Sequence, residues 1–292
     1  MTNPHVRAAG LAAALLCIPG VHAQDEPAAP QDPLQQMQKL FEENGIRLDP
    51  KAKTITVDAE VGRPDQPLEF LLIHQRGKTH EALFVCKAKA SVLNAAFLAL
   101  GYEKGENARV VDKDPLPTPE EVAKGAPIFD VFPPKGMGVW FTVRWKRVND
   151  EGDEVQMEAP VEDLVLDLVT EKPVVDASFI YLGGNMAPMY RDEPPVFMGD
   201  YEGNLISVVY KSPPNHLVTM HHERANDDQI WWQTEMCPPI GTPVEFVIHR
   251  NETKAHQERR ARHEAAKKAA AKDGEDDGAP AKPDEKSGGG GV

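Results

Sequence analysis

The stretch HEALFVCKAKASVLNAAFLALG, residues 80–101, decides the fold. Between residues 81 and 87 the apolar side chains occupy both odd and even positions, and successive side chains of a strand point to opposite faces. A strand that is apolar on both faces is covered on both sides, so we expect a central strand here. The run at residues 92–100 is apolar nearly all round, which predicts a buried helix with Ser91 as N-cap and Gly101 at its end.

Alternating apolar and polar residues around this unit predict further strands. Residues 68–75 form one strand pattern, and the turn Arg76-Gly77-Lys78 joins it to the strand at 81–87, so we expect a β-hairpin. A second hairpin is predicted from residues 138–148 and 154–158. The remaining strand patterns lie at residues 54–57, 108–111, 177–182, 205–210 and 243–249.

Helix signals are few and short. Asp32 and Pro33 are typical of an N-cap followed by a first helical position, and Thr118 begins a second capping signal. Helical spacing of apolar residues predicts one more short helix at 161–170. The fold class we expect is therefore α+β: a β-rich domain with largely antiparallel sheets, one buried helix at 92–100 and a few short helices.

Composition divides the chain into four parts. Residues 1–23 combine one arginine, a short apolar run and a small-residue cleavage site, which is typical of a signal peptide. Residues 24–45 read as a linker and a short helix, and residues 46–250 as a single domain. Residues 251–292 begin as a basic helical segment without an apolar stripe and end as a disordered acidic, glycine-rich tail.

The charge and the signal peptide restrict the partners. The formal net charge is −14, which disfavours nucleic acid because phosphate neutralisation dominates that binding. We expect an exported protein, periplasmic or extracellular, with no transmembrane segment in the mature chain. Its partner is an unknown protein or small-molecule ligand.

Several segments resemble a known family. In sequence order they are HEAL (80–83), LNAAFLALG (93–101), FIYLG (179–183), DYEGNLI (200–206) and PPIGTPV (238–244). In kind and order they resemble the YdjY-type domain, a group of exported bacterial proteins, across most of the predicted domain. The resemblance implies an exported domain and no particular reaction. Some relatives carry iron–sulfur descriptions, and this chain lacks the clustered cysteines that such a centre needs.

The expected first hairpin brings three ligand-capable residues to one end. With a three-residue turn His74 faces His80, and with a two-residue turn it faces Glu81. Directly opposed side chains are close enough to share a metal ion, so His74, His80 and Glu81 are candidate ligands for zinc or copper. The alternative is a solvated hairpin tip with ordinary polar residues.

Two cysteines follow the predicted signal peptide, Cys86 and Cys237. In an exported protein they could form one disulfide. The alternative is that Cys86 is a small buried apolar residue.

The sequence contains no complete catalytic motif: no GxSxG, P-loop, GxGxxG or HExxH pattern. Our first hypothesis is therefore an exported, non-catalytic binding or interaction domain. The alternative is a metal-dependent hydrolase or redox protein with a site near His74, His80 and Glu81. The pair Trp231-Trp232 could stack on sugar rings, or could belong to the core.

Overall fold

The computed structural model describes residues 32–276, with side chains up to residue 269. The predicted signal peptide, most of the linker and the tail beyond residue 276 lie outside the described residues. Within residues 32–276, no helix is both long enough and apolar enough to cross a bilayer.

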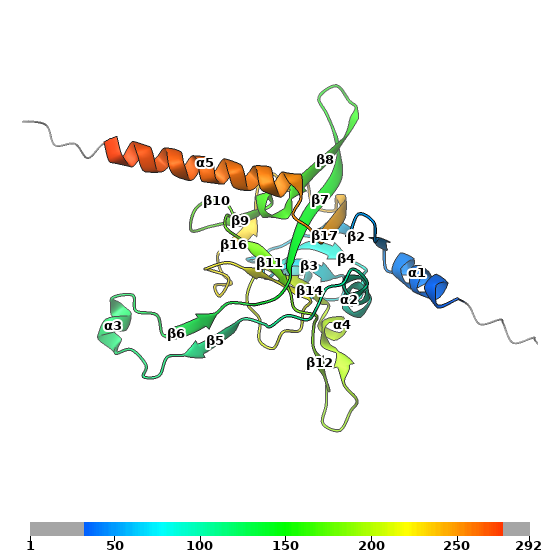
Figure 1. Cartoon of the computed structure of the whole chain (residues 1–292), viewed down its shortest axis with the longest axis horizontal. Coiled ribbons are helices and arrows are strands. Elements are labelled where there is room, and N and C mark those ends of the chain that lie inside the picture. Colours follow the sequence, from blue (N-terminus) through cyan, green and yellow to red (C-terminus); the bar gives the residue numbers. More distant parts are fainter. Residues whose placement is uncertain (1–31, 277–292) are drawn as a thin grey trace, which may run out of the picture.

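The centre of the molecule is a closed barrel of eight strands (Figure 1). In barrel order they are β2 (Thr54–Val61), β17 (Pro243–His249), β7 (Gly138–Val148), β11 (Ser178–Tyr181), β15 (Val218–His221), β14 (Asn204–Ser207), β3 (Phe70–His74) and β4 (Ala82–Cys86). Pairing of β4 with β2 closes the ring. The sheet extends by β1 (Ile46–Asp49) beside β2 and β8 (Glu154–Pro160) beside β7.

Smaller elements surround the barrel. The strands are β5 (Arg109–Asp112) with β6 (Phe129–Phe132), β9 (Val165–Asp167) between β10 (Lys172–Pro173) and β16 (Trp231–Gln233), and β12 (Met186–Ala187) with β13 (Val196–Phe197). The helices are α1 (Pro33–Glu43), α2 (Ala90–Ala99), α3 (Pro119–Ala123), α4 (Met198–Glu202) and α5 (Lys254–Asp276), with 3-10 turns η1 (Thr79–Glu81) and η2 (Val161–Asp163).

The expected β-rich class is confirmed, but the barrel is mixed rather than largely antiparallel. β3 pairs with β4 in parallel, with Phe70 beside Ala82 and His74 beside Cys86, and β14 pairs with β15 in parallel. The predicted hairpin over residues 68–87 is therefore wrong, because residues 75–81 cross back to start β4 in the same direction as β3. Gly77 does not make a hairpin turn; it lets the crossing lie close to Ile73, where an added Cβ would stand 2.7 Å from the side chain.

Both faces of β3 and β4 are buried, as their apolar residues predicted. Most of their side chains join the main core, in which Phe84, Phe246, Phe141 and Phe179 form a row of aromatic contacts at centroid distances of 4.8–5.7 Å. A smaller buried cluster, Phe70, Ile73, Ala82 and Val85, takes residues from both faces of the two strands. Because every position of β3 and β4 is buried, these strands carry no alternating polar residues.

Helix α2 is buried on one face only, which corrects the expectation of a buried helix at 92–100. Its inner face stacks Phe97 on Tyr181 with ring centroids 4.8 Å apart, whereas Leu98 is 54% exposed. The N-cap is Lys89, not Ser91. Ser91 lies in the first turn, and Asp200 accepts its backbone N–H at 2.8 Å.

The helix predicted at 161–170 is also wrong. The chain makes only the 3-10 turn η2 and then strand β9, which is paired on both sides by β10 and β16. A short apolar run fits both the helical period of 3.6 residues and the strand period of two. Here the pairing with β16, a segment distant in sequence, selects the strand.

Barrel closure generates a prediction at Gly62, the residue after β2. Its N–H donates to the carbonyl of Leu83 at 2.8 Å, and an added Cβ would stand 2.6 Å from the backbone oxygen of Ala82. We expect Gly62→Ala to lower the free energy of unfolding by about 1–3 kcal/mol, as overpacking does. Gly138→Ala is the matched control, because its Cβ would meet nothing closer than 3.4 Å. Equal urea midpoints for the two variants would contradict the prediction.

Candidate binding cleft beneath the C-terminal helix

The predicted metal ligands do not come together. His74 ends β3 and accepts the N–H of Arg76 on Nδ1, whereas His80 and Glu81 lie in η1, before the start of β4. Because β3 and β4 run in parallel, these positions are at opposite ends of the strand pair. Glu81 instead binds Lys78 at 3.0 Å. Within the described residues, no group of three or more His, Cys, Asp or Glu is arranged to hold a metal ion.

Cys86 and Cys237, for which the sequence left a disulfide as one possibility, are both free thiols. Burial raises the pKa of each thiol to about 12, so both stay protonated at neutral pH. Cys86 lies buried in β4 against the apolar core, which is the alternative that the sequence allowed.

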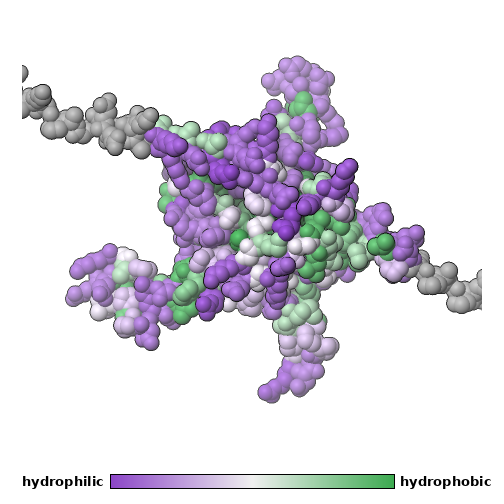
Figure 2. All heavy atoms as spheres, viewed as in Figure 1, coloured by the Kyte–Doolittle hydropathy of each residue, from purple (hydrophilic) through white to green (hydrophobic). Residues whose placement is uncertain are grey.

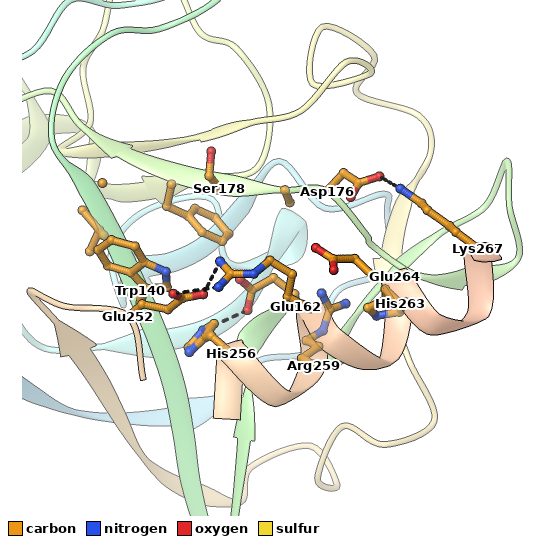
Figure 3. A pocket seen from close by; sticks show the side chains of 15 residues that line it. Trp140, Glu162, Asp176, Ser178, Glu252, His256, Arg259, His263, Glu264 and Lys267 are labelled. Carbon is orange, nitrogen blue, oxygen red and sulfur yellow. Dashed lines mark hydrogen bonds and ion pairs between the residues drawn. The ribbon is translucent and has the colours of Figure 1, made fainter. Parts of the chain in front are cut away.

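A cleft of about 320 Å³ lies between α5 and the barrel (Figure 3). The barrel side is formed by β7 and β11 and includes Trp140 and Ser178. The facing side is the first half of α5, which contributes His256, Arg259 and His263. The helix therefore forms one wall of the cleft.

Helix α5 is attached by charge rather than by an apolar stripe. Arg259 is only 7% exposed; its guanidinium donates to the carboxylate of Asp163 and to the carbonyl of Val174. Further along, Lys267 pairs with Asp176 where both side chains are largely exposed. The sequence interpretation of a helix with nothing to bury missed this attachment, because the buried face consists of polar residues.

A carboxylate and an imidazole meet at the base of the cleft. Glu162 comes from η2 and His256 from the first turn of α5, and each residue is 6% exposed. Their Oε2 and Nε2 atoms are 3.4 Å apart, and neither atom has a hydrogen-bond partner among the described residues. The other ring nitrogen, Nδ1, lies 2.7 Å from the hydroxyl of Thr253. Figure 3 shows the two side chains pointing toward one another.

The rim of the cleft has little excess charge. Arg260 pairs with Glu252 at 2.6 Å, and Lys267 pairs with Asp176. The charged side chains that line the cleft are Arg259, Arg260 and Lys267 on one hand and Glu162, Asp176, Glu252 and Glu264 on the other. The cleft thus offers both hydrogen-bond donors and acceptors, and it has no strong excess of positive or negative charge.

A smaller polar pocket of about 170 Å³ lies near β14. The two oxygens of the Glu202 carboxylate accept the amide N–H groups of Asn204 and Asn215 at 2.7 and 2.6 Å. This holds both amide oxygens away from Glu202, and neither has a partner among the described residues. His216 beside them is fully buried, and burial, assisted by the charge of Lys211, lowers the pKa of His216 to about 3.

Comparison with known proteins found no matching family model, no matching curated protein and no matching solved structure. The resemblance to the YdjY-type domain therefore stays a prediction.

Sequence reasoning missed Glu162 and His256 because 94 positions separate them and no motif joins them. The one local signal was Thr253, which stands at the start of the basic helix as an N-cap residue does. It indicates the beginning of α5, but it does not reveal what the helix covers.

The attachment of α5 leads to a prediction on Arg259. Arg259→Ala leaves Asp163 without its partner, and breaking a buried ion pair in this way costs about 3–5 kcal/mol. We expect the amides of α5 to lose most of their protection in hydrogen exchange. Lys267→Ala breaks a comparable pair on the same helix, but an exposed one worth about 0–1 kcal/mol, and should leave exchange nearly unchanged. Similar protection in both variants would contradict the prediction.

The depressed pKa of His216 leads to a prediction on pH. Below about pH 6.5 the unfolded chain protonates this histidine, whereas the folded chain does so only near pH 3. The free energy of unfolding should therefore decrease as the pH is lowered from about 6.5 toward 3, by up to about 1.4 kcal/mol per pH unit from this group. Above about pH 6.5 this group should have no effect on stability. Urea unfolding of His216→Leu between pH 7 and pH 4 should show a shallower fall. Parallel curves for the variant and the natural chain would contradict this.

Proposed function

We propose that this chain is an exported, non-catalytic binding domain that holds a neutral, hydroxyl-bearing ligand, such as a sugar ring, in the cleft beneath α5. The observation that carries the proposal is the pair at its base: Glu162 Oε2 and His256 Nε2 are buried and lie 3.4 Å apart, at ion-pair distance, and neither makes a hydrogen bond within the described residues. Buried polar atoms are normally paired, and those that are not call for an explanation.

A hydroxyl group suits this pair better than other small groups. Glu162 Oε2 can only accept a hydrogen bond when ionised, whereas His256 Nε2 accepts or donates according to its tautomer. A hydroxyl both donates and accepts, so it can bond to the carboxylate and to the imidazole in either state. A carboxylate or phosphate ligand would meet repulsion from Glu162.

The walls of the cleft support the same class of ligand. Trp140 is partly exposed on the strand side, where an aromatic face can cover the apolar face of a sugar ring. The mixed and mutually paired charges of the rim favour a neutral molecule over an ion. A volume of about 320 Å³ is at the lower end of ligand pockets, roughly 300–1,000 Å³, and suits one or two rings.

The arrangement favours binding over catalysis. Ser178 lines the cleft, but the Nδ1 of His256 contacts the hydroxyl of Thr253. Within the described residues, the Ser178 hydroxyl makes no hydrogen bond to His256 or to Thr253. The metal-dependent alternative would need His74, His80 and Glu81 at one place, and the parallel strands keep His74 from the other two. The proposal that the chain is exported rests on the predicted signal peptide at residues 1–23, which lies outside the described residues.

The test is titration of the purified chain with a panel of neutral mono- and disaccharides by calorimetry and saturation-transfer NMR. We expect saturable binding of at least one sugar. Glu162→Gln should weaken it about tenfold or more, since a hydrogen bond to a charged group is worth about 1.5–3 kcal/mol. Trp140→Ala should weaken it comparably.

Trp232→Ala is the matched control, because Trp232 is also a partly buried tryptophan but does not line the cleft. It should bind as the natural chain does. If no sugar binds, or if the Trp232 variant loses binding as fully as the Trp140 variant, the proposal is wrong.

A further inference from the structure

Residues 106–135 form an arm that projects from the barrel (Figure 1). Its shaft is the antiparallel ribbon of β5 and β6, and α3 lies at the tip. A bridge between Glu106 and Lys135 joins the two chains of the arm at its base. There Gly105 and Gly136 allow a close approach, since their added Cβ atoms would stand 2.4 and 3.0 Å from the backbone oxygen of Tyr181. The base is therefore fixed to the body.

The arm is rich in exposed apolar side chains, and Figure 2 shows apolar surface along it. Eight of them are between 39% and 64% exposed: Val110, Val111, Leu116, Val122, Ile128, Phe129, Val131 and Phe132. All residues of β5 and β6 are exposed, so nothing in the described chain covers either face of the ribbon.

The two faces of the ribbon differ. On one, Arg109 lies over the ring of Phe132 at 5.0 Å, so a charged group covers part of the apolar surface. On the other, Val110 pairs with Val131, and Phe129 follows two positions along, where it pairs with Asp112 at the outer end of the ribbon. We call Val110, Phe129 and Val131 the apolar face; Asp112 lies at its outer edge. A two-stranded ribbon is marginally stable alone in water, and such a surface normally marks an interaction site.

We propose that the apolar face is covered by the apolar face of a second copy of this chain, with the two arms antiparallel about a two-fold axis. In this arrangement the tip of each arm lies against the base of the other. Contact of one patch with its own copy closes the assembly at two chains.

The charge distribution along the arm favours this occupant. The outer part, residues 110–131, carries five acidic and two basic side chains: Asp112, Asp114, Glu120, Glu121 and Asp130 against Lys113 and Lys124. The base of the arm and the residues that flank it, 103–109 and 132–136, carry three basic and two acidic side chains: Lys104, Arg109 and Lys135 against Glu103 and Glu106. An acidic tip therefore meets a basic base twice in the antiparallel dimer, whereas arms lying parallel would place tip against tip.

The first test is the mass of the chain in solution, measured by sedimentation equilibrium between about 1 and 100 µM. We expect a dimer, and we expect Val131→Asp to be a monomer at the same concentrations. Val148→Asp is the matched control, because Val148 is 62% exposed at the end of β7, outside the arm. It should remain a dimer. A natural chain that is monomeric throughout the range overturns the proposal, as does a Val131 variant that still dimerises.

A charge exchange tests the charged contacts between the two arms independently of arm folding. One variant reverses the base with Lys104→Glu and Lys135→Glu, and the other reverses the tip with Asp114→Lys and Glu120→Lys. Each alone should dimerise at least tenfold more weakly at low salt, because like charges then meet at both contacts. An equimolar mixture should restore the dimer, since each tip again faces an opposite base. A mixture no stronger than the separate variants would overturn the contact of charged tips and bases that the proposed dimer requires.

Discussion

The pairing of β4 with β2 is the constraint on which the rest of the structure depends. It places Ala59 beside Cys86 and Val61 beside Phe84, and it closes eight strands of the sheet into a barrel. β4 runs antiparallel to β2 and parallel to β3, and the crossing at residues 75–81 gives it this direction. Both faces of β3 and β4 are buried in the closed barrel.

The crossing in turn organises the polar surroundings of β14. Gly77 and Gly203 lie so close that a Cβ on Gly203 would stand 2.9 Å from the Cα of Gly77. Gly203 has a φ of +80°, which ends α4 and directs the chain into β14. The short helix α4 then presents Asp200 to the first turn of α2 and Glu202 to the two asparagines. One backbone contact thus positions both a helix start and a buried polar pocket.

The sequence predicted those features that depend on neighbouring residues. The strands at 138–148 and 243–249 were predicted with the bounds that the structure has, and the caps at Asp32 and Thr118 are confirmed. It failed where distant residues decide. The turn signal at Arg76-Gly77-Lys78 fits both a hairpin turn and a crossing connection. Only the pairing of β4 with strands distant in sequence shows which of the two the chain forms. Glu162 and His256 come together only because η2 and α5 dock.

The attachment of α5 has a consequence for the cleft. The helix has no apolar face to bury, so Arg259 and its bonds to Asp163 and Val174 carry most of its docking. These bonds are buried and therefore little affected by salt, unlike the pair at Lys267. Because His256 belongs to the same helix, the site at its base exists only while α5 is docked. A ligand that bonds to both Glu162 and His256 joins the helix to the barrel, so binding must also stabilise docking, by linkage.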